Sequence, residues 1–173
     1  MPLDPNQVTK RPIETDDLPF LQYLYGTTRV MELAAVEWSD EEKVAFIAQQ
    51  FQAQHYHYTT YFYDAAFDLL LLDKQTIGRL YVHRSPSEIR IMDIALLPAY
   101  CNQGLGSFLI KQLMADAFDN NQKVSLHVEP YNPARHLYQR LNFQYVETNG
   151  AYELMCWQPQ TSKPEQPLNA DFS

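Results

Sequence analysis

Residues 97–107 read LPAYCNQGLGS and join an apolar run, residues 89–97, to a helical pattern that continues to about Asn120. The whole chain has only five glycines, and two of them, Gly104 and Gly106, lie in this stretch. Glycine permits positive φ and leaves nearby backbone amides open to a ligand. The first turn of the following helix adds unpaired N–H donors and the positive end of the helix dipole. The stretch therefore predicts a phosphate- or pyrophosphate-binding loop, although a tightly packed strand–turn–helix corner uses glycines in the same way.

Length and composition indicate a soluble globular protein. The 173 residues suffice for one domain with a sizeable core, and 46% of them are apolar and 20% charged. Thirteen basic and 21 acidic residues give a net charge of −8 and a pI near 5.0. This balance argues against nucleic acid or an anionic membrane surface as a partner, because either calls for a basic face. It is compatible with a cationic or amine substrate.

The cysteines, the first residues and the aliphatic runs all point to the cytoplasm. Cys101 and Cys156 are the only cysteines, and their spacing fits neither a disulfide framework nor a metal site. The first residues lack the basic start and apolar core of a signal peptide, and the longest aliphatic run, residues 69–72, is too short to cross a bilayer. His55 and His57 form a His-x-His pair without an apparent third ligand, so no metal is predicted.

The hydrophobic patterns predict the order β-α-α-β-β-β-α-β-α-β-β, a mixed α/β fold. Strands are expected at residues 8–13, 67–72, 76–82, 89–97, 123–128, 144–148 and 152–157, and helices at 15–26, 39–54, 105–120 and 132–142. Ser39 and Glu42 at the start of the second helix have the form of a capping box. We expect a single domain over residues 1–157, and a disordered tail over 158–173 because that segment is polar with almost nothing to bury.

A second motif lies further along the chain. Residues 126–143 read LHVEPYNPARHLYQRLNF and combine a strand, a helix that begins with Asn-Pro-Ala and contains Leu-Tyr, and a terminal Phe. This segment resembles the last block of the GCN5-related N-acetyltransferases (GNAT), and residues 93–107 resemble their acyl-CoA pyrophosphate loop. The two motifs have the family's order and about its usual separation. The resemblance covers roughly residues 8–157 and implies a mixed, mostly antiparallel central sheet flanked by helices.

The resemblance implies that acetyl-CoA is the donor and that the acetyl group passes directly to an amine, without a covalent acyl-enzyme. It also implies that the pyrophosphate is bound by the backbone amides of Asn102, Gln103, Gly104, Leu105, Gly106 and Ser107. The peptide-like pantetheine arm is then expected to bind to the strand backbone of Ile94, Ala95 and Leu96 and to Asn132. An Asn before Pro also suits a helix N-cap with proline at the first helical position.

Proton transfer falls on two further side chains. The resemblance implies that Tyr138 points its hydroxyl at the CoA sulfur and acts as the general acid, a role worth about 10²–10⁴-fold in rate. The alternative is that Tyr138 is one more core aromatic among twelve tyrosines. The ribosomal-protein alanine acetyltransferases have a glutamate five residues before the motif asparagine. His127 takes that position here and suits a general base, with a structural histidine as the alternative and Asp93 as the second candidate base.

Three residues depart from the family pattern. Cys101 and Asn102 replace the usual Arg or Gln followed by Gly, and Asn142 replaces a Gly at the end of the last helix. Asparagine tolerates left-handed backbone better than most residues, so Asn102 and Asn142 are expected to substitute for glycine. Cys101 removes a polar side chain from the loop, and we therefore expect weaker CoA binding.

The acceptor is the least defined part of the sequence. Five aromatic residues of an aromatic-rich segment are candidates for an acceptor pocket: Tyr56, Tyr58, Tyr61, Phe62 and Tyr63. The alternative is a half-buried loop and helix end that packs on the sheet. The sequence thus predicts an N-acetyltransferase for a primary amine of a small molecule or a peptide N-terminus, present as a monomer or homodimer. A non-catalytic acyl-CoA-binding module is the other hypothesis.

Overall fold

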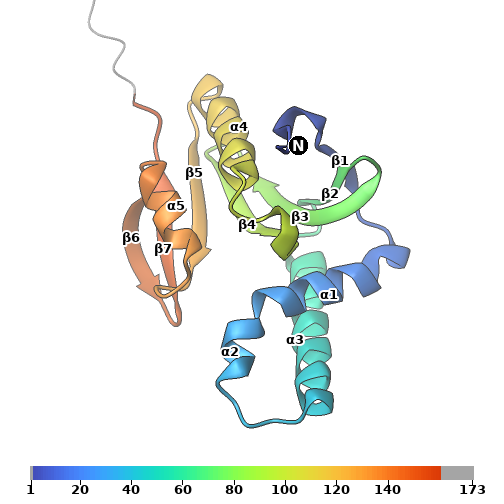
Figure 1. Cartoon of the computed structure of the whole chain (residues 1–173). Helices are drawn as coiled ribbons and strands as arrows, with labels where there is room; N and C mark the ends of the chain where they lie inside the picture. Colours follow the sequence, from blue (N-terminus) through green and yellow to red (C-terminus); the bar gives the residue numbers. More distant parts are fainter. Residues whose placement is uncertain (1, 161–173) are drawn as a thin grey trace, which may run out of the picture.

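The computed structural model describes residues 2–160 (Figure 1), so most of the predicted tail, residues 161–173, lies outside the described residues. The strands are β1 (Thr9–Pro12), β2 (Ala66–Leu72), β3 (Gln75–Arg84), β4 (Glu88–Leu96), β5 (Lys123–Val128), β6 (Gln144–Asn149) and β7 (Tyr152–Trp157). The helices are α1 (Leu18–Thr28), α2 (Val30–Ala34), α3 (Asp40–Tyr61), α4 (Leu105–Asp119) and α5 (Ala134–Arg140). Short 3₁₀ turns occur at Pro5–Gln7, Thr15–Asp17 and Pro98–Tyr100.

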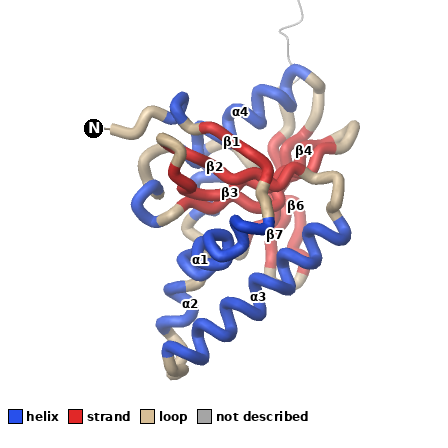
Figure 2. The backbone as a smooth tube through the Cα atoms, turned by 90° about the vertical axis from the view of Figure 1, so that its right-hand side faces the viewer, coloured by secondary structure: helices blue, strands red, loops and turns tan. Residues whose placement is uncertain are grey.

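The strands form one seven-stranded sheet in the order β1-β2-β3-β4-β5-β7-β6. Every neighbouring pair is antiparallel except β4 and β5, which are parallel. Figure 2 shows α4 on one side of the sheet and α1, α2 and α3 on the other. The predicted mixed, mostly antiparallel sheet flanked by helices is confirmed.

The helices on the α3 side differ from the prediction in two ways. Helix α3 continues to Tyr61 instead of ending near Gln54, so the aromatic-rich segment is largely helical and not a loop. No Gly or Pro interrupts it, and aromatic and β-branched residues cost only tenths of a kcal/mol each in a helix. The short helix α2 was not predicted. At the start of α3, Ser39 Oγ accepts from the Glu42 amide at 3.1 Å, as expected for a cap.

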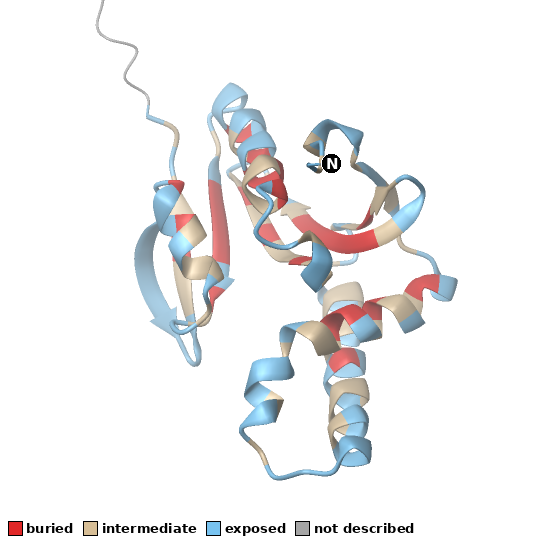
Figure 3. Cartoon of the chain, viewed as in Figure 1, coloured by how far each residue is buried: buried red, intermediate tan, exposed pale blue. Residues whose placement is uncertain are grey.

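Two groups of buried side chains hold the layers together. The larger one lies between the sheet and α4, and it includes Ile91, Leu109, Leu113 and Leu126. The smaller one, Leu21, Tyr25, Phe51 and Leu69, joins α1 and α3 to the outer sheet. Figure 3 shows burial concentrated along β5, on the inner side of α4 and where α1 crosses α3. Both groups of buried side chains therefore pack against the sheet.

Strands β4 and β5 pair only at their beginning. The parallel register ends at Ile91 and Leu126, after four residue pairs. Beyond it β4 pairs only with β3, and β5 pairs only with β7. Met92 is skipped in the β3–β4 register, and such a bulge bends the strand that carries it. The backbone of residues 92–96 is therefore open on the side that faces β5.

Gly78 on β3 gives a test of how tightly this part of β4 is held. A Cβ at Gly78 would overlap the carbonyl oxygen of Ala95 and come within 2.9 Å of Leu96 Cδ2. We expect Gly78→Ala to lower the free energy of unfolding by about 1–3 kcal/mol, because β4 must move to accept the methyl group. Chemical denaturation measures the change. In the control Gly26→Ala the new Cβ meets only Ile47 Cγ2 at 3.4 Å, so no loss is expected; equal stability of the two variants would contradict the prediction.

Candidate active site

The glycine-containing loop has left-handed backbone at the two positions that the sequence suggested. Asn102 has φ +59° and Gly104, at the N-cap of α4, has φ +83°. The expectation that asparagine tolerates this conformation is confirmed here and at Asn142, where φ is +68°. Gln103 Nε2 donates to the Ala99 carbonyl at 2.6 Å and closes the loop on itself. The loop is thus pre-shaped by its own contacts.

The backbone amides of residues 102–107 are free to bind an anion. Along the chain from Asn102, the first backbone amide that donates a hydrogen bond within the protein is that of Phe108, to the Gly104 carbonyl at 3.0 Å. Within residues 2–160, none of the six preceding amides donates to another backbone or side-chain acceptor, as expected for a first helical turn. A Cβ built at Gly104 meets nothing within 4 Å, so the space above the loop is open. Open amides at the start of a 15-residue helix suit a phosphate group.

A groove of about 1080 Å³, called here the α4-side groove, extends from this loop between α4 and α5. Predicted site residues that line it are Ile94, Leu96, Asn102, Gly104, Gly106, Ser107 and Tyr138. Gln103 and Leu105 do not line it, and the Leu105 side chain is buried in the core. Cys101 lines the groove as well and is exposed.

Tyr138 reaches the groove from α5. Its side chain is 7% exposed and packs against Phe143, with ring centroids 6.0 Å apart. Burial, together with the negative charge of Asp93, raises the pKa of Tyr138 to about 12. The phenol therefore stays protonated at neutral pH, so the groove holds a hydroxyl group that can donate a hydrogen bond or a proton.

A second cavity, of about 700 Å³, lies on the other side of β4 and is called the α3-side cavity. Ile94 lines both spaces, so they meet where β4 and β5 part. The predicted residues Asp93, Ala95, His127 and Asn132 line the α3-side cavity. The aromatic candidates divide: Tyr58 and Phe62 line it, whereas Tyr56, Tyr61 and Tyr63 do not. The side chains of these three residues face solvent: Tyr56 and Tyr61 are each 68% exposed, and Tyr63, just beyond α3, is 82% exposed.

Asp93 is held by a buried arginine. Arg79, from β3, forms an ion pair with the Asp93 carboxylate, donates to Gln54 Oε1 at 2.8 Å and is only 2% exposed. Burial lowers the pKa of Arg79, but the charge and hydrogen bond of Asp93, together with the nearby Tyr81 and Tyr58, more than offset that effect, so the pKa lies above its usual value. Sequence reasoning missed Arg79, because nothing in its local sequence signals a partner 14 residues away. The pair places a carboxylate beside the open edge of β4.

Tyr58 connects α3 to the bulge of β4. Its hydroxyl donates to the Met92 carbonyl at 3.4 Å, and its ring packs edge-on against Tyr81 at 6.0 Å. Burial and the Asp93 charge raise the pKa of Tyr58 above its usual value, so its hydroxyl stays neutral. The part of α3 beyond Gln54, which the sequence did not predict to be helical, thus forms one wall of the cavity.

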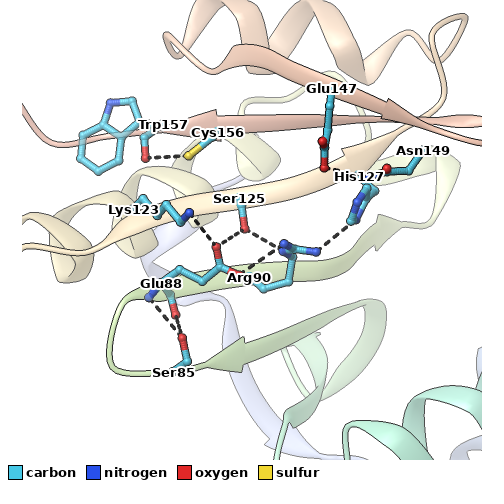
Figure 4. Close-up of polar contacts among 10 residues, drawn as sticks. All are labelled: Ser85, Glu88, Arg90, Lys123, Ser125, His127, Glu147, Asn149, Cys156 and Trp157. Atoms are coloured by element: carbon cyan, nitrogen blue, oxygen red, sulfur yellow. Dashed lines mark hydrogen bonds and ion pairs between the residues drawn. The ribbon is translucent and has the colours of Figure 1, made fainter.

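His127 lies at the point where the strands part, one residue beyond the last pair of β4 and β5. Figure 4 shows its ring close to Arg90, and Arg90 Nη1 lies 3.1 Å from His127 Nδ1. Desolvation and the Arg90 charge lower the pKa of His127, and the charges of Glu147 and Glu88 oppose that shift. At neutral pH the imidazole is therefore mainly uncharged.

Asn132 lies beside the ion pair of Arg29 and Glu129. Its Oδ1 accepts from the Ala134 amide at 3.0 Å, and its Nδ2 donates to Glu129 Oε2 at 3.5 Å. Helix α5 begins at Ala134 with Pro133 at the N-cap, so the predicted N-cap role of Asn132 was wrong; its side chain instead forms a turn just before the helix. Arg29, which sequence analysis missed, pairs with Glu129 at 3.1 Å and ties α1 to this loop.

Among residues 2–160, no group of three or more His, Cys, Asp or Glu side chains is placed to hold a metal ion. No helix within these residues combines the length and the hydropathy needed to cross a membrane.

Several solved structures share this fold. The PaiA N-acetyltransferase from Thermoplasma acidophilum, solved in complex with coenzyme A, has a TM-score of 0.63 and 16% identity, over 87% of this chain and 98% of its own. The spermidine N-acetyltransferase from Vibrio cholerae, in complex with CoA and spermine, has a TM-score of 0.59 and 21% identity, over 88% and 96%. The ribosomal-protein-S18-alanine N-acetyltransferase from Escherichia coli has a TM-score of 0.57 and 19% identity, over 91% and 97%.

A family model covers most of the site as well as most of the chain. The model described as the acetyltransferase (GNAT) family matches residues 27–143, which include the loop, the open part of β4, His127 and Tyr138. The chain therefore belongs to the acetyltransferase (GNAT) family.

Proposed function

We propose that this chain is an acetyl-CoA-dependent N-acetyltransferase that transfers the acetyl group directly to a primary amine of a small molecule or of a peptide N-terminus. The observation that carries the proposal is the open edge of β4, which runs between an anion-binding loop and Tyr138 and faces a separate cavity through Ile94. The relatives solved with coenzyme A or with an amine support a donor and an acceptor of these classes.

The α4-side groove suits the donor. The amides of residues 102–107 would hold the pyrophosphate, with Asn102 and Gly104 giving the loop its left-handed turns. The pantetheine arm carries amide groups, and it would pair with the open backbone of Ile94, Ala95 and Leu96 as an added strand. Asn132, in the loop between β5 and α5, would form a hydrogen bond with the same arm. The thioester then lies near Ile94, where groove and cavity meet.

The reaction joins groups from both sides of β4. A neutral amine in the α3-side cavity attacks the thioester carbonyl, the C–N bond forms, and the C–S bond breaks. Tyr138 gives its proton to the departing thiolate, and the amine proton passes to a base. His127 and Asp93 both line the cavity and are the two candidates for that base.

Tyr138 and the relatives of the same fold favour an enzyme over a non-catalytic acyl-CoA-binding module. A module that only binds CoA needs the loop and the β4 edge, whereas Tyr138 adds a protonated hydroxyl group to the groove, and the relatives solved with coenzyme A or with an amine are N-acetyltransferases. Coenzyme A-dependent thermal stabilisation with no thiol release for any amine would instead support the binding module.

Replacing Tyr138 tests the proposed acid. We expect Tyr138→Phe to lower kcat about 10²-fold or more, with little change in the Kd of CoA, because only proton transfer to the thiolate is lost. The assay measures thiol release from acetyl-CoA with a panel of amino acids, polyamines, aminoglycosides and peptides. Tyr56→Phe is the matched control, since Tyr56 is 68% exposed on α3 and lines neither space. An unchanged kcat in Tyr138→Phe would exclude the acid role.

Replacing Gly104 tests the loop. Both Gly104 and Gly150 have positive φ and open space around them, at +83° and +60°, so alanine costs each site about 1–2 kcal/mol of backbone strain. We expect only Gly104→Ala to weaken CoA binding, by roughly tenfold, because relief of the strain turns the loop amides away from the pyrophosphate. Isothermal titration calorimetry gives Kd, and denaturation of both variants gives the shared loss of stability. Equal CoA affinity in the two variants would contradict the assignment of the loop.

A further inference from the structure

Besides its contact with His127, the guanidinium of Arg90 is held by hydrogen bonds to two other side chains. Its Nε donates to Ser125 Oγ at 2.7 Å, and its Nη2 donates to Glu88 Oε1 at 3.3 Å. Ser125 is 2% exposed and donates in turn to Glu88 Oε2 at 3.2 Å, while Lys123 Nζ lies 3.6 Å from the same oxygen. Figure 4 shows this connected row from Glu88 to His127. The guanidinium therefore presents its remaining N–H groups in a set direction.

The contact with Arg90 defines which nitrogen of His127 carries the proton. A guanidinium only donates hydrogen bonds, so Nδ1, at 3.1 Å from Arg90 Nη1, is the unprotonated acceptor. The proton of a neutral imidazole then lies on Nε2. Charged groups face the ring from two elements: Arg90 and Glu88 from β4, and Glu147 from β6. The desolvation and the positive charge that lower the pKa of His127 favour the same neutral form.

This arrangement leaves His127 poorly suited to take a proton from the acceptor. Its only lone pair for a proton already accepts from Arg90, and its other nitrogen is a donor. Asp93 differs, because its ion pair with Arg79 uses Oδ2 and its Oδ1 has no partner among the described residues. Of the two candidate bases, Asp93 is the one with a lone pair to offer.

We propose that Arg90 is a positioning residue which holds His127 in its Nε2–H tautomer, so that His127 donates a hydrogen bond to a carbonyl or carboxylate oxygen next to the amine of the acceptor. This inference rests on the proposed function and narrows its substrate class. The preferred acceptors are α-amino amides, peptide N-termini or free α-amino acids, and not plain aliphatic amines. His127 lines the α3-side cavity at the parting of β4 and β5, beside the open edge where the thioester is proposed to lie.

The tautomer is measurable without any acceptor. In ¹⁵N-histidine-labelled protein at neutral pH, two-bond ¹H–¹⁵N correlation spectra report the protonation of each ring nitrogen, and His127→Gln assigns the signal. We expect the Nε2–H form in the wild type and a mixture of tautomers in Arg90→Met. Thermal unfolding with CoA present shows whether Arg90→Met is folded. Arg90→Lys keeps a donor and is the control, in which we expect the Nε2–H form to remain. An Nδ1–H form in the wild type would overturn the proposal.

The substrate class is tested with alaninamide, alanine and isopropylamine, which present a carboxamide, a carboxylate or a methyl group beside the same amine-bearing carbon. The readout is kcat/KM for each, in the wild type and in His127→Phe. We expect His127→Phe to lower the preference for alaninamide or alanine over isopropylamine by about threefold to tenfold, the value of one neutral hydrogen bond. Comparing ratios between the two proteins cancels the different amine pKa values. The stronger of the first two acceptors identifies amide or carboxylate as the recognised group.

His127→Gln separates donation from base catalysis. Glutamine keeps an N–H donor near the position of Nε2 and takes no proton, so we expect it to retain transfer and most of the preference. Loss of transfer to all three acceptors in His127→Gln, with the acid limb of the pH profile of kcat/KM removed, would show that His127 is the base and overturn the proposal. An equal loss for all acceptors in His127→Phe would overturn it too. Absence of transfer by the wild type to every amine tested would contradict the proposed function itself, and with it this inference.

Discussion

The parting of β4 from β5 is the constraint on which the rest of the site depends. The parallel pairing stops after four residue pairs, and β4 is then held only by β3 while β5 is held only by β7. The bulge at Met92 bends β4 at that point, and Tyr58 holds the bulge from α3. Strand backbone left without a neighbour exposes N–H and C=O groups, so the gap leaves an open strand edge. Ile94, on this edge, lines both the α4-side groove and the α3-side cavity.

Three arginines surround the α3-side cavity, and each has a carboxylate partner. Arg29 pairs with Glu129, Arg79 with Asp93, and Arg90 with Glu88. Arg79 is the most buried of the three, and removing Asp93 would leave its charge without compensation, which is costly in the interior. Although the whole chain carries a charge of −8, the cavity wall is thus close to neutral. A cavity wall with little net charge fits the proposal that His127 recognises the acceptor through a directed hydrogen bond.

Much of the fold follows from local sequence, and the exceptions have physical reasons. Glycines at a strand-to-helix junction, alternating apolar residues and a serine cap each act within a few residues, so the strands, helix α4 and the loop were placed correctly. Helix α3 was predicted too short because its last turns have modest intrinsic propensity and depend on packing of Tyr58 against Tyr81 of the sheet. Helix α2 has five residues and no side-chain cap, so it has no strong local signal.

By itself the sequence indicated the family, the order of the strands and of every helix except α2, the left-handed backbone at Asn102, and the candidate roles of Tyr138 and His127. These depend on residue type and short spacing. Only the tertiary structure decided which side chains meet. Arg90 reaches His127 because β4 and β5 share a parallel register, and Arg29 reaches Glu129 across 100 residues because α1 lies beside the loop that follows β5. A contact between distant segments is fixed by strand register and helix packing, which no local pattern encodes, and the tautomer proposed for His127 rests on such a contact.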